Sequence, residues 1–125
     1  MKDPNLRFLV VGGYDTWKKG NVVKIPRVPR KVVRYYYAAC DVLVLPRPRH
    51  IATEIAAPTK FAEYVAMGKP VLVTDVGDPA TFTKKYRCGI VVKDNSPSEL
   101  LRGIYEFMNM DVDQLKDMGK RSRIL

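Results

Sequence analysis

The apolar positions of this chain fall into short unbroken runs that alternate with amphipathic stretches. The runs are rich in β-branched residues and end at glycine, proline or aspartate, which is typical of β-strands. They predict strands at Arg7–Val11, Val22–Ile25, Val42–Leu45, Pro70–Thr74 and Ile90–Lys93. The runs at 42–45 and 70–74 show no polar alternation, which indicates parallel strands buried under helices, with both sides of the 42–45 strand covered.

The stretches between these runs carry helix signals. Pro29 suits the first turn of a helix, and apolar residues then recur at the spacing of one helical face. That face consists of Val32, Val33, Tyr36, Tyr37 and Cys40. Ser96, Pro97 and Glu99 are typical of a helix start, because they supply a cap, a proline at the first position and a glutamate three residues after the cap. We predict helices from Pro29 to Asp41, at Pro58–Met67, at Ala80–Tyr86, from Ser96 to Phe107 and at Val112–Leu125.

Strands that alternate with helices over the whole length predict an α/β fold with a doubly wound parallel sheet. The 125 residues suit one folding unit, so we expect a single domain over residues 1–125. In such sheets ligands bind beyond the carboxyl ends of the strands. The candidate loops are therefore those after Val11, Leu45 and Thr74.

The balance of charge is strongly basic, with 22 Lys and Arg against 13 Asp and Glu and a formal net charge of +9. This excess favours anionic partners such as phosphates, nucleic acid or acidic lipid surfaces, and does not choose among them. A basic nucleic-acid-binding domain is one alternative, although the sequence has no recognisable nucleic-acid motif. Its affinity would fall steeply as salt rises, which gives a direct test.

Location and redox chemistry follow from what the sequence does not contain. No apolar run approaches the roughly eighteen residues of a membrane-spanning helix, and Met1–Asn5 lacks the features of a signal peptide, so we expect a cytoplasmic protein. Cys40 and Cys88 lie far apart, without CxxC spacing or paired histidines. We therefore expect buried free thiols and no metal site, since the only histidine, His50, has no second ligand at metal spacing.

The segment from Glu54 to Asp78 is the most informative for chemistry. A helix that starts at Pro58 presents free backbone N–H groups near Thr59 and Lys60, which form an anion site without any side chain. Lys60 adds a positive charge at that end, where the helix dipole disfavours a cation, so a bound phosphate would explain it. Glu63 lies three residues on, where its carboxylate could accept both hydroxyls of a ribose. An ion pair between Lys60 and Glu63 is the purely structural alternative.

A glycine pair, Gly12–Gly13, ends the first predicted strand. Such a pair is a turn in most proteins, but its place at a strand's carboxyl end also makes it a candidate for phosphate contact. A lone pair is weaker evidence than a full GxGxxG motif, so both interpretations stay open.

The stretch Ala57–Val71 resembles the pattern Pro-x-Lys-x-x-Glu-Tyr-x-Ala-x-Gly-Lys-Pro-Val of the family-four glycosyltransferases, which have the GT-B fold. The flanking segments resemble the same family, so the likeness covers nearly the whole chain. These segments are Val28–Pro46, Cys88–Val92 and Ser96–Phe107.

The resemblance implies a Rossmann-like domain, the carboxyl-terminal half of a GT-B enzyme that binds a nucleotide-diphosphate sugar. It implies that Glu63 holds the ribose of this donor, and that Lys60 and the helix start at Thr59 meet the diphosphate. It also implies retaining transfer of the sugar without a bound metal. An earlier glutamate of the family falls here on Ile55, with Glu54 adjacent as the candidate for handling the sugar.

Two further departures from the family concern what surrounds the domain. By this resemblance, we expect the chain to start at the second strand of the family's domain and to lack the amino-terminal domain that binds the acceptor. We therefore expect a fragment that is inactive alone, with a sugar or lipid-linked acceptor reached through the missing domain and with peripheral membrane contact as one option. A non-catalytic α/β interaction domain is a second alternative, disfavoured because no acidic cluster follows the first strand.

Overall fold

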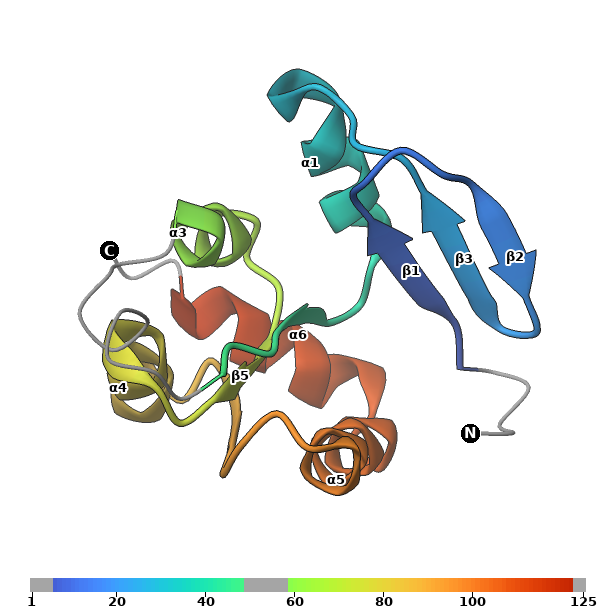
Figure 1. Ribbon diagram of the computed structural model, residues 1–125. Helices are drawn as coiled ribbons and strands as arrows, with labels where there is room; N and C mark the ends of the chain where they lie inside the picture. Colours follow the sequence, from blue (N-terminus) through green and yellow to red (C-terminus); the bar gives the residue numbers. More distant parts are fainter. Residues whose placement is uncertain (1–5, 49–58, 123–125) are drawn as a thin grey trace. The chain divides into compact units, whose positions relative to one another are not determined.

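The computed structural model describes residues 6–48 and 59–122 (Figure 1). It divides into two compact units, Met1–Tyr36 and Tyr37–Leu125, with the boundary inside helix α1 (Arg30–Ala39). Each unit has its own three-stranded sheet, so each is described by itself.

The first unit contains a mixed sheet with the strand order β1-β3-β2. Its strands are β1 (Phe8–Val11), β2 (Trp17–Lys19) and β3 (Val22–Ile25). The two predicted strands β1 and β3 pair in parallel, and β2 pairs with β3 in antiparallel orientation. The sequence prediction missed β2, because its three residues are all exposed and show no apolar alternation. Backbone pairing with β3 forms this strand.

Helix α1 follows Pro29 as the sequence predicts, but its apolar face is covered less than expected. No residue of the helix is fully buried. Val33, Tyr36 and Tyr37 are half-buried, whereas Val32 is 38% exposed, so its assignment to the covered face was wrong.

The second unit confirms the predicted α/β fold with a parallel sheet. Strands β4 (Leu43–Leu45), β5 (Val71–Thr74) and β6 (Gly89–Val92) are parallel in the order β4-β5-β6. Figure 1 shows β5 among the helices of this unit. They are α3 (Thr59–Ala66), α4 (Gly77–Tyr86), α5 (Pro97–Met108) and α6 (Val112–Arg121).

Helices cover both faces of this sheet, as expected of a doubly wound fold. On one face α3 and α4 pack against the strands, and Phe61 meets Phe82 edge to face with the ring centres 5.4 Å apart. On the other face Phe107 of α5 packs on Leu72, with side chains of α6 beside it. All of β5 is buried. Strand β4 lies at the edge of this sheet, and its Val44 is 36% exposed. The prediction that both sides of this strand are covered was therefore wrong.

The amino ends of the strands are packed backbone against backbone. A Cβ on Gly89 would lie 2.0 Å from the carbonyl oxygen of Val71, and one on Gly119 would lie 2.2 Å from that of Gly68. The Ser122 hydroxyl fixes the end of α6, since it donates to the carbonyl of Val65 at 3.0 Å. Only glycine at positions 89 and 119 leaves room for the backbone contacts with Val71 and Gly68.

The helix boundaries largely follow local sequence signals. Ser96 caps α5 by accepting from the amide of Glu99, as predicted, and Asp111 and Gln114 form a reciprocal cap on α6. Helix α4 begins at Gly77, earlier than the predicted Ala80, because Pro79 is tolerated in a first turn, where no intrahelical donor is needed. Within the described residues, no helix is long and apolar enough to cross a membrane.

Candidate functional site

The carboxyl edge of the parallel sheet brings two predicted loops together. Strands β4 and β5 are neighbours with Leu45 opposite Val73, so the segments that follow them leave from the same edge. The hydroxyl of Thr74 donates to the carbonyl of Arg47 at 2.6 Å and ties these segments to each other. The third predicted loop, after Val11, belongs to the first unit.

Helix α3 begins at Thr59, within a residue of the predicted start. The first N–H groups of a helix have no partner within it and suit an anion. Lys60 lies in this first turn with its side chain exposed. Among the described residues Lys60 takes part in no ion pair, so the structural alternative of a Lys60–Glu63 pair is not what the structure shows.

Glu63 lies one turn further along α3, and its carboxylate has a defined partner. The hydroxyl of Tyr37 donates to Oε2 of Glu63 at 3.3 Å. The Tyr37 ring meets Tyr64 edge to face, with ring centres 5.1 Å apart, which fixes the position of the donor. Burial, then the neighbouring Tyr37, Glu63 and Cys40, raise the pKa of Tyr64 to about 12, so that phenol stays protonated at neutral pH.

Tyr37 is the residue that the sequence prediction missed. Its helical spacing assigned it to core packing, and it does pack against the core. Its hydroxyl nevertheless reaches a carboxylate 26 positions away. The usable signal was its chemistry, because a half-buried tyrosine needs a partner for its hydroxyl.

A second helix start lies at the same edge. Helix α4 begins directly after β5, and its cap residue Val76 supplies no side-chain hydrogen bond. Gly77, with φ of 63°, allows the turn from strand to helix. Asp75 is held by Lys84 at 2.8 Å. The first N–H groups of α4 therefore lack a side-chain cap, in contrast to those of α5 and α6.

The glycine pair of the first unit forms a turn. The φ angles of Gly12 and Gly13 are 151° and 65°, and the amide of Gly12 donates to the carbonyl of Ile25 at 3.1 Å. Lys24 contacts the carbonyl of Gly12 and pairs with Asp15 at 2.7 Å, so a cation lies beside the turn. Because these residues belong to the first unit, phosphate contact by Gly12 and Gly13 stays a prediction.

Several predicted residues fall elsewhere. Glu54 and His50 lie outside the described residues, so the role predicted for Glu54 stays a prediction. Neither Cys40 nor Cys88 forms a disulfide, and Cys88 is fully buried, as predicted. Cys40 is only half-buried, so the predicted burial was wrong for that thiol. Over residues 6–48 and 59–122, acidic, histidine and cysteine side chains form no group of three that could hold a metal.

A parallel α/β sheet with two helix starts at its carboxyl edge defines a Rossmann-like domain, in which ligands bind at that edge. The chain matches the family model of the glycosyl transferases group 1 over residues 1–110 of its 125, and it belongs to this family. Its class of activity is therefore glycosyl transfer. No curated protein matches the chain.

Proposed function

We propose that the start of α3 binds a nucleotide-diphosphate sugar, the donor for a retaining glycosyl transfer. The N–H groups at Thr59 and the ammonium of Lys60 hold the diphosphate, while Glu63 accepts hydrogen bonds from the ribose hydroxyls. Glu54 and the turn at Gly12–Gly13 belong to the same proposal, as contacts to the sugar and the phosphates.

The observation that carries this proposal is the position of Glu63. Its carboxylate lies one turn from a helix start that bears an exposed lysine with no ion pair among the described residues, and the Tyr37 hydroxyl donates to this carboxylate. An oriented carboxylate next to an anion-binding helix end matches the two halves of a nucleoside diphosphate, a diol and a diphosphate. The uncapped start of α4 adds a second set of N–H donors at the same edge.

The remaining parts of the proposal follow from the family. The acceptor, a sugar or a lipid-linked sugar, is bound by the other domain of the GT-B fold. The reaction needs no metal and takes place in the cytoplasm, at the membrane surface where the acceptor is lipid-linked.

The test is calorimetric titration of the chain with UDP, GDP, ADP and their sugar conjugates. We expect one nucleotide to bind with a dissociation constant of about 1 mM. In Glu63→Gln and Lys60→Gln the affinity should fall about tenfold, since each loses a charged hydrogen-bonding partner of the donor. Glu106→Gln and Lys93→Gln are the matched controls, since both residues are exposed and lie on or beside α5.

Equal affinity in Glu63→Gln and the unchanged chain would overturn the ribose assignment. Binding that responds to Lys60 but not to Glu63 would leave only an anion site at the helix start. The stereochemical part is tested separately, by proton NMR of the product formed when the acceptor domain is supplied. A product of inverted anomeric configuration would overturn the retaining mechanism.

A further inference from the structure

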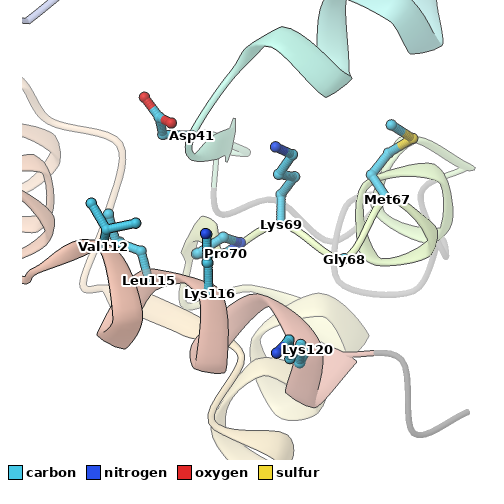
Figure 2. A pocket seen from close by; sticks show the side chains of 9 residues that line it. All are labelled: Asp41, Met67, Gly68, Lys69, Pro70, Val112, Leu115, Lys116 and Lys120. Atoms are coloured by element: carbon cyan, nitrogen blue, oxygen red, sulfur yellow. The ribbon is translucent and has the colours of Figure 1, made fainter.

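The amino ends of the same sheet border a second hollow, remote in the topology from the proposed donor site. It is a groove of about 320 Å³ between α6 and the turn that joins α3 to β5 (Figure 2). Its charged side chains are Lys69, Lys116, Lys120 and Asp41. Three ammonium groups against one carboxylate leave the groove with a net charge of +2.

Two of these lysines are placed together at an electrostatic cost. Lys116 and Lys120 are four residues apart, so they lie on one face of α6, where like charges repel. Figure 2 shows them on successive turns, with Lys69 extending from the turn before β5. None of the three pairs with a carboxylate among the residues that the structure describes. The dipole of α6 favours Lys120 in the last turn, but it does not account for Lys116 a full turn earlier.

The groove has fixed walls. Gly119 lies between the two α6 lysines in sequence and brings α6 against the backbone of Gly68 and Lys69. Ser122 fastens the end of the helix to Val65 at 3.0 Å. The backbone positions from which the lysines extend are therefore fixed on two sides of the hollow, and this pre-organisation lowers the entropic cost of binding.

The rest of the lining is apolar. Val112 and Leu115 of α6 and Pro70 at the start of β5 form this part of the wall. A ligand that fits both parts has a phosphate for the lysines and an organic stem for the apolar wall, because compact ammonium groups suit phosphate oxygens.

We infer that this groove is a second anion site, in which Lys69, Lys116 and Lys120 hold the phosphate of an organic phosphate ester. The shared chemistry is a phosphate on an apolar stem, whether it comes from a membrane phospholipid or from a soluble metabolite. The site is independent of the proposed donor site, which lies at the carboxyl ends of the strands.

The experiment is a titration of the isotopically labelled chain with inorganic phosphate and with glycerol 3-phosphate, followed by amide NMR shifts. We expect saturable shifts at Gly68, Lys69 and Gly119, which identify this groove separately from any binding near Lys60 and Glu63. The double variant Lys116→Gln/Lys120→Gln should weaken binding at these amides about tenfold. The matched control is Lys85→Gln/Lys93→Gln, which removes the same charge from surfaces outside the groove.

A second arm distinguishes the two sources of the phosphate. Vesicles of phosphatidylcholine with one fifth phosphatidic acid are compared with pure phosphatidylcholine in a sedimentation assay. Binding to the acidic vesicles that the groove variant loses and the control retains would identify a lipid head group, whereas shifts with glycerol 3-phosphate alone would identify a soluble ester.

Two outcomes would overturn the inference. One is the absence of saturable shifts at the groove with both soluble phosphates, together with no selective vesicle binding. The other is an equal loss of affinity in the groove variant and the control, which would reduce the effect to net charge. Lys69→Gln tests the third lysine, which is half-buried. Lys116 and Lys120 are exposed, so the double variant tests the inference even if Lys69→Gln does not fold.

Discussion

The two ends of the parallel sheet are built in opposite ways. At the amino ends the backbone is in direct contact with itself, through Gly89 against Val71 and Gly119 against Gly68. At the carboxyl ends, helix α4 starts without a side-chain cap, and Lys60 is exposed without an ion pair among the described residues. The glycine contacts at the amino ends join backbone to backbone. The carboxyl ends leave backbone N–H groups and the ammonium of Lys60 available to a ligand.

For the glycine contacts and the proposed donor site, this difference separates stability of the fold from nucleotide binding. Substitutions at the glycine contacts should change the free energy of unfolding, because a backbone atom cannot move out of the way as a side chain can. Substitutions around Glu63 should change nucleotide affinity and leave unfolding nearly unaltered. The predictions below test that separation.

The largest effect is expected for Gly89→Ala. Its Cβ would lie 2.0 Å from the carbonyl oxygen of Val71, so β5 and β6 must move apart. We expect a loss of about 3 kcal/mol in the free energy of unfolding, measured by urea denaturation. A loss below about 1 kcal/mol would show that the two strands can shift cheaply and would remove the contrast between the ends.

Gly119→Ala should come next, with a loss of about 2 kcal/mol, since the clash with Gly68 is partly offset by the better helix propensity of alanine. Hydrogen exchange should show α6 opening first. Gly103→Ala is the matched control, because its new Cβ meets the side chains of Leu72 and Val92 rather than backbone. We expect this control to stay within about 1 kcal/mol of the unchanged chain, and equal losses in both variants would contradict the prediction.

Ser122→Ala should cost about 1 kcal/mol, because it removes a buried hydroxyl that donates toward the carbonyls of Val65 and Gly119. Thermal unfolding of the variant gives the measurement. Ser98→Ala is a suitable control, since that serine is exposed in the first turn of α5. A neutral Ser122→Ala would mean that packing at Gly119 alone fixes α6.

The smallest change in stability is expected for Tyr37→Phe, at about 0.5 kcal/mol. The ring contact with Tyr64 is kept, and the 3.3 Å hydrogen bond to Glu63 is lost. Nucleotide affinity should nevertheless fall about fivefold, because the carboxylate loses its orienting partner. Unchanged affinity in the same titration would show that Tyr37 serves packing alone.

Local chemistry made much of the second unit predictable from sequence. The unbroken apolar run Val71–Val73 identified a buried strand, and the side chains of β5 are indeed covered on both faces. The cap at Ser96 was recognisable because its hydrogen bonds join neighbouring residues. The family pattern also selected Lys60 and Glu63 as candidate donor-binding residues, and their role stays a prediction.

What the sequence could not predict depends on contacts between distant segments. Strand β2 forms through pairing with β3, and no pattern of its own reveals it. Val44 is exposed because β4 is an edge strand, and the apolar sequence of β4 does not reveal its place in the sheet. The hydrogen bond from Tyr37 to Glu63 joins two helices 26 positions apart, and no local sequence pattern predicts it.

Cys88 precedes β6 at the tightly packed end and is fully buried. Burial raises the pKa of its thiol, so little thiolate forms at neutral pH and no reagent reaches the sulfur in the folded state. Alkylation of Cys88 therefore requires the core around this thiol to open. The alkylation rate of Cys88 thus reports how often the core of the native chain opens. Half-buried Cys40 should react faster and serves as the reference thiol on the same molecule.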